Sequence, residues 1–320
     1  MSSASKQNRR PKLTLKLFLL FVTAVAVLFG LSTQQYFQMR AEESYLNHLK
    51  NRLGEVNAPI EDTRHLKSAE SENYLDQMLW VKFDYQYDKQ GVFQNDVVPP
   101  GPEWLRRHVG DNIFARVQTL SISTDEFDSY YEYVSYRRID TDALNGIEKL
   151  AQLQKLSISV ENVPSLANLE SLPKLEELDL RTGKSFPVDL TDLSKLPSLK
   201  RARVEGPTIV TNESQVRRSK IEFLELKENH LITDLTCVRF AENLTELKID
   251  NCIELRSLKG IENLKALEKL SLSRCQSLKS LDGIQSIAHL QVLSLHEVPI
   301  VGEVDYEHLP ASVEQLKVVD

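Results

Sequence analysis

Most of the chain after residue 150 repeats one short pattern of apolar and polar positions. An LxxLxL arrangement recurs eight times, and its first positions are separated by 22, 24, 22, 23, 23, 23 and 23 residues. Within each copy the last apolar positions alternate with polar ones, which predicts a short strand with one buried face. The copies are Leu153/Leu156/Ile158, Leu175/Leu178/Leu180, Leu199/Ala202/Val204, Ile221/Leu224/Leu226, Leu244/Leu247/Ile249, Leu267/Leu270/Leu272, Leu290/Leu293/Leu295 and Val313/Leu316/Val318.

Two further registers precede this array. Tyr131/Val134/Tyr136 lies 22 residues before the first copy, and Val117/Leu120/Ile122 lies 14 residues before that. The short step predicts that the strand at Val117 is a capping strand or an irregular repeat. A second irregularity is expected over residues 205–218, where the apolar residues between strands are missing.

The segments between strands carry a pattern of their own. The LxGIxxL pattern Leu144-Gly146-Ile147-Leu150 recurs from Leu258 to Leu264 and, with Ile287 in its last position, from Leu281. Apolar residues three apart suit a short 3₁₀ or helical return that points back at the strand leucines.

One fixed position after the strands, called the slot here, holds Asn229, Cys252 and Cys275 in successive repeats. Their side chains are expected to be buried and to form hydrogen bonds with loop backbone. Cys252 and Cys275 are therefore expected as buried thiols, with a bridge between them as the alternative.

On these residues the chain from about 117 to 320 resembles the leucine-rich-repeat superfamily. The resemblance implies an α/β solenoid: a horseshoe with a concave parallel β-sheet and short 3₁₀ or helical returns on its convex side. The stretch from Trp104 to Arg107, followed by Gly110-Asp111-Asn112 and Phe114, also looks like membrane-anchored leucine-rich-repeat proteins of bacteria.

The N-terminal residues predict a segment that spans a membrane. Residues 17–31 carry no charge, and the segment 13–31 is 19 residues long, enough to span about 28 Å as a helix. Five cations precede it within residues 1–16, which predicts a cytoplasmic N-terminus and an extracytoplasmic repeat domain. An uncleaved signal-anchor is favoured, with secretion after cleavage near Ser32 as the alternative.

Between the membrane segment and the repeats we expect a helix and a small module. Tyr45, Leu46, Leu49 and Leu53 recur at helical spacing, which predicts a juxtamembrane stalk or, as the alternative, a short dimerising coil. Alternating residues over 81–88 predict a strand in a cap that covers the first repeat. The expected organisation is a basic head over 1–12, a transmembrane helix over 13–31, a juxtamembrane helix and linker over 32–78, a cap module over 79–116 and the repeat domain over 117–320.

Positions three, five and seven of each LxxLxLx strand are expected to face solvent on the concave side, and equal positions of neighbouring strands to stack. Charges alternate in sign along these columns, which predicts cross-strand neutralisation. The same surface is the first candidate for partner binding, with Phe223 as an exposed aromatic between Arg201 and Glu246. The candidate residues are Arg181, Arg201, Arg203, Phe223, Glu225, Lys227, Glu246, Lys248 and Asp250.

The charge and composition of the chain argue against nucleic-acid binding and against catalysis. The formal net charge is −7, and because residues 1–16 carry +5 the remainder carries −12, which disfavours nucleic acid as a partner. Three cysteines fall in no metal-binding spacing, and no catalytic motif is present, so we expect no metal, cofactor or enzymatic activity. The hypothesis is a non-catalytic protein-protein interaction module. The alternatives are a structural envelope protein that self-associates through the last strand, Val313 to Val319, and an enzyme with a site in residues 55–116.

Overall fold

The computed structural model describes residues 33–51, 79–86, 94, 97–100, 103, 107, 115–123, 144–160, 163, 166–210, 219–299 and 309–319. The segment 13–31, the linker over 52–78 and the register at Tyr131 lie outside these residues. Within them, no helix is both long and apolar enough to cross a membrane.

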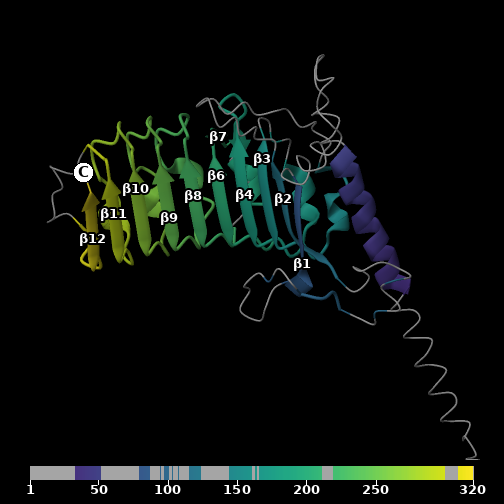
Figure 1. The fold of residues 1–320 in the computed structure, drawn as a ribbon. Helices are drawn as coiled ribbons and strands as arrows, with labels where there is room; N and C mark the ends of the chain where they lie inside the picture. The colour runs from purple at the N-terminus through teal and green to yellow at the C-terminus, as the bar shows by residue number, and fades with distance from the viewer. Residues whose placement is uncertain are drawn as a thin grey trace, which may run out of the picture.

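One curved ten-stranded sheet organises the molecule, in the order β1-β2-β3-β4-β6-β8-β9-β10-β11-β12 (Figure 1). All neighbouring pairs from β2 onward are parallel, and β1 alone runs antiparallel to its neighbour β2. The strands are β1 (Leu79–Phe83), β2 (Val117–Ser123), β3 (Lys155–Val160), β4 (Glu177–Thr182), β6 (Arg201–Glu205), β8 (Phe223–Lys227), β9 (Glu246–Asp250), β10 (Lys269–Ser273), β11 (Val292–His296) and β12 (Gln315–Val319).

The predicted repeats are confirmed strand by strand. The middle apolar position of each copy pairs with its equivalent in the next, from Leu156 opposite Leu178 to Leu293 opposite Leu316. Because equal positions stack, the apolar side chains form one continuous core from Val117 to Val298. Val117/Leu120/Ile122 forms β2, which pairs with β3 in the same parallel register as the repeats and with β1 on its other side.

Short 3₁₀ returns lie between the strands, as the sequence predicts: η3 (Ile147–Lys149), η4 (Leu166–Ser171), η6 (Thr236–Val238), η7 (Ile261–Asn263) and η8 (Ile284–Ser286). The glycine before η3, η7 and η8 has a positive φ, which the LxGIxxL pattern supplies. One return is the α-helix α4 (Leu190–Leu193), and it is capped by the carboxylate of Asp189, which accepts from the Thr191 N–H at 2.9 Å.

The irregular stretch after β6 contains an element that the sequence pattern missed. β7 (Thr208–Ile209) pairs with β5 (Val188–Asp189) in a separate two-stranded parallel sheet. Thr208 is buried, and its hydroxyl accepts a hydrogen bond from the Asn229 amide at 2.5 Å. Residues 211–218 of the expected bulge lie outside the described chain.

The cap differs from expectation in two ways. The strand expected over 81–88 is shorter, because β1 ends at Phe83 and the 3₁₀ turn η1 (Asp84–Gln86) follows. The helix over residues 33–51 lies beside the β1–β2 end of the solenoid (Figure 1), and Tyr45 and Leu49 are part of the repeat core. The interpretation of this helix as a free stalk is therefore wrong over these residues, because one apolar face is buried against the first repeats.

A buried ion pair joins this helix to the sheet. Glu42 and Arg116 are 4% and 7% exposed, and the Glu42 carboxylate accepts from the Val117 N–H at 3.4 Å. The Arg116 guanidinium lies 4.0 Å from the same carboxylate and donates to the Gln35 carbonyl at 3.5 Å. Burial raises the pKa of Glu42 to about 7 against the opposing influence of the Val117 N–H and Arg116.

Candidate functional site

The concave face of the sheet is the candidate functional site, and its three columns form as the sequence predicts. Position three runs Lys155, Glu177, Arg201, Phe223, Glu246 and Lys269 in successive strands; position five runs Asp179, Arg203, Glu225 and Lys248; position seven runs Arg181, Glu205, Lys227 and Asp250. From β3 to β10 these positions hold seven cations and six carboxylates. The concave face is thus nearly neutral in a protein of net charge −7.

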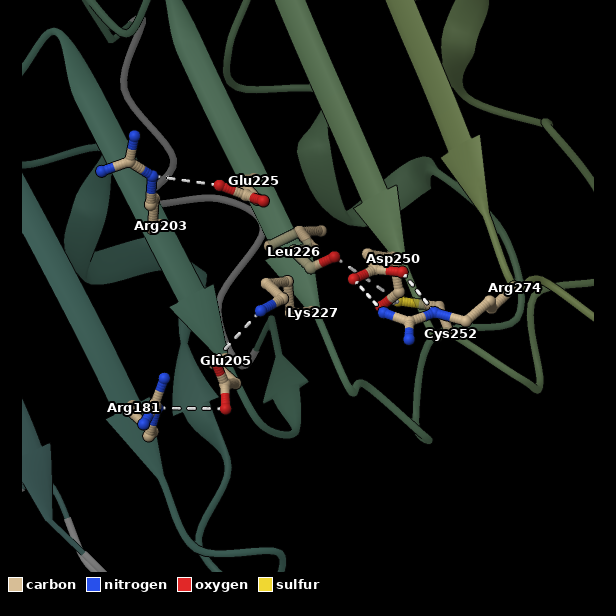
Figure 2. A network of polar contacts seen from close by, with 9 residues as sticks. All are labelled: Arg181, Arg203, Glu205, Glu225, Leu226, Lys227, Asp250, Cys252 and Arg274. Carbon is tan, nitrogen blue, oxygen red and sulfur yellow. Dashed lines mark hydrogen bonds and ion pairs between the residues drawn. The ribbon is translucent and has the colours of Figure 1, made fainter. Parts of the chain in front are cut away.

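Cross-strand ion pairs account for much of this charge (Figure 2). In position seven, Glu205 lies between Arg181 at 3.0 Å and Lys227 at 3.5 Å. In position five, Arg203 Nε donates to Glu225 at 3.0 Å. In position three, Lys155 lies 3.1 Å from Glu177. The predicted neutralisation is confirmed for these pairs, and each exposed pair contributes about 0–1 kcal/mol to stability.

Two pairs depart from the simple column rule. Lys248 pairs with Glu246 of its own strand at 3.1 Å rather than with a neighbouring strand. Asp250 accepts from Arg274 through both carboxylate oxygens, with Nε to Oδ1 at 2.9 Å (Figure 2). Arg274 lies one residue after β10, where sequence alternation alone gives no sign of a concave contact.

Arg274 is the first residue after its strand, and the residues at this position form a second periodic feature. Glu228, Asn251, Arg274 and Glu297 all have φ near +50°, a left-handed conformation that is rare outside glycine. Each N–H donates to a carbonyl at the end of the next strand, from Glu228 to Asp250 at 3.0 Å through to Glu297 to Val319 at 2.9 Å. The ladder bonds hold these residues in a strained conformation and aim Arg274 at Asp250.

The slot that follows is buried, as expected. Asn229 Oδ1 accepts from the N–H groups of Leu231 and Ile232 at 2.9 and 3.3 Å. Cys252 Sγ lies 3.6 Å from the Asp250 carbonyl and 3.8 Å from that of Leu226 (Figure 2). Cys252 and Cys275 are free thiols, and burial raises their pKa values to about 12 and about 11.

Phe223 corrects an expectation. Its ring is 2% exposed, so it is not the exposed aromatic that the alternation predicts. It lies on the concave side, outside the contiguous apolar core, and the side chains of Arg201, Arg203 and Lys248 lie over it. Long cationic side chains with apolar stems can cover a ring, which residue type and alternation cannot reveal.

Two hollows lie on this face. One, of about 190 Å³, is lined in part by Lys155, Glu177, Asp179, Arg201 and Arg203. The other, of about 310 Å³, is lined in part by Arg181, Glu205, Glu225 and Lys227. Asp179 borders both, and limited hydration raises the pKa of its carboxyl although Arg203 and Arg181 act in the opposite direction. No group of three or more His, Cys, Asp or Glu that could hold a metal ion occurs within the described ranges.

The stacked registers, the 3₁₀ returns and the buried Asn/Cys slot define a leucine-rich-repeat solenoid. No protein-family model matches the sequence, and no curated protein matches it. Among solved structures, the chain is similar to internalin C2 of Listeria monocytogenes, with 20% identity over 63% of this chain and 80% of that chain and a TM-score of 0.42. It is also similar to the leucine-rich-repeat domain of the type III effector XopL, with 19% identity over 54% and 71% and a TM-score of 0.38. A leucine-rich-repeat protein of Leptospira interrogans is 21% identical over 48% and 45%, with a TM-score of 0.32.

Proposed function

We propose that this protein is a non-catalytic protein-binding module that uses the concave face of its sheet. The observation that carries the proposal is the geometry of that face. Nine parallel strands stack their outward positions in register and so present a continuous polar surface across the solenoid. Such an extended surface suits a macromolecular partner, because a small ligand would contact only a fraction of it.

The proposal includes a location. Residues 13–31 would hold the protein in a membrane, with the basic head in the cytoplasm and the repeat domain outside it; secretion after cleavage near Ser32 is the alternative. The support comes from the length of the uncharged segment and from the cations that precede it.

Photo-crosslinking in intact cells tests the binding surface. A photoreactive residue in place of Lys227, on the concave face, should capture a protein partner. The same residue in place of Glu170, exposed on the return η4, serves as the matched control and should capture much less. Equal capture from both positions, or none from either, would refute a concave docking surface.

Proximity labelling from residue 320 tests the location in the same cells. Labels on extracytoplasmic proteins are expected, because the repeat domain follows the membrane segment. Labels on cytoplasmic proteins would refute the proposed topology and leave the binding surface to be judged by the crosslinks.

A second candidate function is self-association through β12, where the pattern of burial is unusual. In the described part of the chain β12 pairs only with β11. Leu316 and Val318 are partly exposed, whereas their equivalents in β11 are buried, and Val319 is 51% exposed. An open parallel edge of this kind can accept another strand. Sedimentation of the purified full chain in detergent would show oligomers in this case and a monomer otherwise.

A further inference from the structure

The buried ring of Phe223 interrupts a column of alternating charges. Position three places an acid or a base in the five other strands between β3 and β10, and Phe223 stands between the base Arg201 and the acid Glu246. Arg201 Cζ lies 4.2 Å from the ring centroid, with Lys248 Nζ at 5.3 Å and Arg203 Cζ at 5.4 Å. A cation over an aromatic face is held by the quadrupole of the ring, so these three side chains are gathered at one point.

Among the residues that the structure describes, carboxylates pair with two of these three cations and leave Arg201 uncompensated. Arg203 is bonded to Glu225 and Lys248 to Glu246. Arg201 has no carboxylate within 4.0 Å in the described part of the chain, because Glu177, its neighbour in β4, pairs with Lys155. Arg201 is exposed, and its guanidinium is oriented by the ring beneath it.

The hollow of about 190 Å³ lies beside this guanidinium and is small enough to suit one side chain of a partner. Its lining is mixed, because Glu177 and Asp179 face it together with Lys155, Arg201 and Arg203. Asp179 also has no cation within 4.0 Å in the described ranges, so its carboxylate makes the electrostatic potential inside the hollow more negative. A doubly charged phosphate would be repelled by these acids more than a single carboxylate, and a carboxylate matches the fork of a guanidinium.

Resting on the proposed protein-binding function, we propose that Arg201, held on the ring of Phe223, is the anchor for one acidic side chain of a protein partner that enters the hollow between β3 and β6. Asp179 selects for a singly charged group. Phe223 is a positioning residue, because it orients the guanidinium and does not itself touch the carboxylate.

Binding of fluorescein-labelled hexaglutamate to the purified full chain, at low ionic strength, tests this assignment. We expect Arg201→Gln to weaken binding at least tenfold, as loss of a charge-assisted bidentate contact does. Lys269→Gln is the matched control: it removes one charge from an exposed lysine of the same column, away from the ring, and should change affinity by about twofold or less. Arg201→Lys keeps the charge but not the fork and should weaken binding several-fold.

Two more arms address the chemistry of the ligand. Asp179→Asn removes a like charge from the hollow and should strengthen hexaglutamate binding several-fold. Hexaphosphoserine, a peptide of the same length, should bind the wild-type chain more weakly than hexaglutamate does. Tighter binding would overturn the assignment to a carboxylate.

Equal losses in Arg201→Gln and Lys269→Gln would overturn the proposal, because they would show a diffuse field instead of a site. Absence of binding by the wild-type chain at millimolar peptide would overturn it as well. If the Lys227 crosslinks persist while either of these two results is found, the proposed docking of a protein on the concave face is retained and only the role of Arg201 as its anchor is refuted. If those crosslinks are absent, the proposed function itself fails.

Discussion

Gly260 and Gly283 occupy equivalent positions before η7 and η8. Comparing their replacement by alanine separates the conformational cost of a positive φ from the steric cost of an added Cβ. Their φ values are +103° and +95°, so alanine at either position must adopt a left-handed conformation. That conformation costs an L-residue about 1–2 kcal/mol. The surroundings differ, which makes Gly283→Ala the natural control for Gly260→Ala.

A Cβ at Gly260 would lie 2.5 Å from the carbonyl carbon of Leu235 and 2.5 Å from the nitrogen of Thr236. These are backbone atoms of the preceding repeat, and the neighbouring Leu235 N–H is bonded to the Lys259 carbonyl at 2.8 Å. Relief of the overlap requires the two loops to separate and to weaken that bond. At Gly283 the nearest atom is the side-chain Cγ2 of Ile261 at 3.6 Å, an ordinary contact.

We therefore expect Gly283→Ala to cost about 1–2 kcal/mol and Gly260→Ala about 2–5 kcal/mol, since loss of a buried backbone hydrogen bond adds about 1–3 kcal/mol to the conformational cost. Urea unfolding of the full chain, followed by far-UV circular dichroism, measures both free energies. The slope against urea must be compared as well, because a solenoid can unfold in sections. Equal losses in the two variants would refute the argument that close packing of the loops fixes the Gly260 position.

Three other predictions follow from buried groups. The pKa of Glu42 rises from its ordinary value to about 7 on folding, so the folded state holds this proton more tightly than the unfolded chain does; the stability that this one group contributes should be fully present below about pH 4.5 and be lost, by roughly 3 kcal/mol, as the pH rises through 7. Urea midpoints at pH 5 and pH 8 should show this decline in the wild type and much less of it in Glu42→Gln; a parallel decline in both would contradict it. Phe223→Ala should lower stability by about 3 kcal/mol, because it removes a buried ring and the cationic contacts made to it; an unchanged melting temperature would show that the ring is not buried in solution. Cys252 and Cys275 have pKa values raised to about 12 and about 11, so iodoacetamide at pH 8 should label neither thiol in the folded protein and both in urea, as mass spectrometry would show; rapid labelling without urea would contradict their burial.

Much of the candidate site followed from periodicity. The spacing of the leucines fixed which residues stack in each concave column, and Arg181, Glu205 and Lys227 lie as that spacing predicts. Phe223 could not be placed by the same rule, because alternation assigns a side of the sheet but not the depth at which neighbouring side chains bury a residue. The contact of Arg274 with Asp250 depends on a left-handed residue after the strand, and local sequence carries no signal for that conformation at an arginine.

The leucine pattern by itself determined the architecture, since apolar residues every 22 to 24 positions can all be buried only if successive coils stack with their strands in parallel. Tertiary structure alone decided what lies against the ends and faces of that stack. The helix over 33–51 could be a stalk or a short dimerising coil on its own amphipathic pattern, and only the tertiary contacts with Arg116 and the core around Tyr45 place it against the first repeats. In the same way, Arg201 is an ordinary surface arginine in the sequence. Folding puts a ring below it and pairs its neighbouring acid, Glu177, with Lys155, so that it becomes an oriented charge with no carboxylate partner among the described residues.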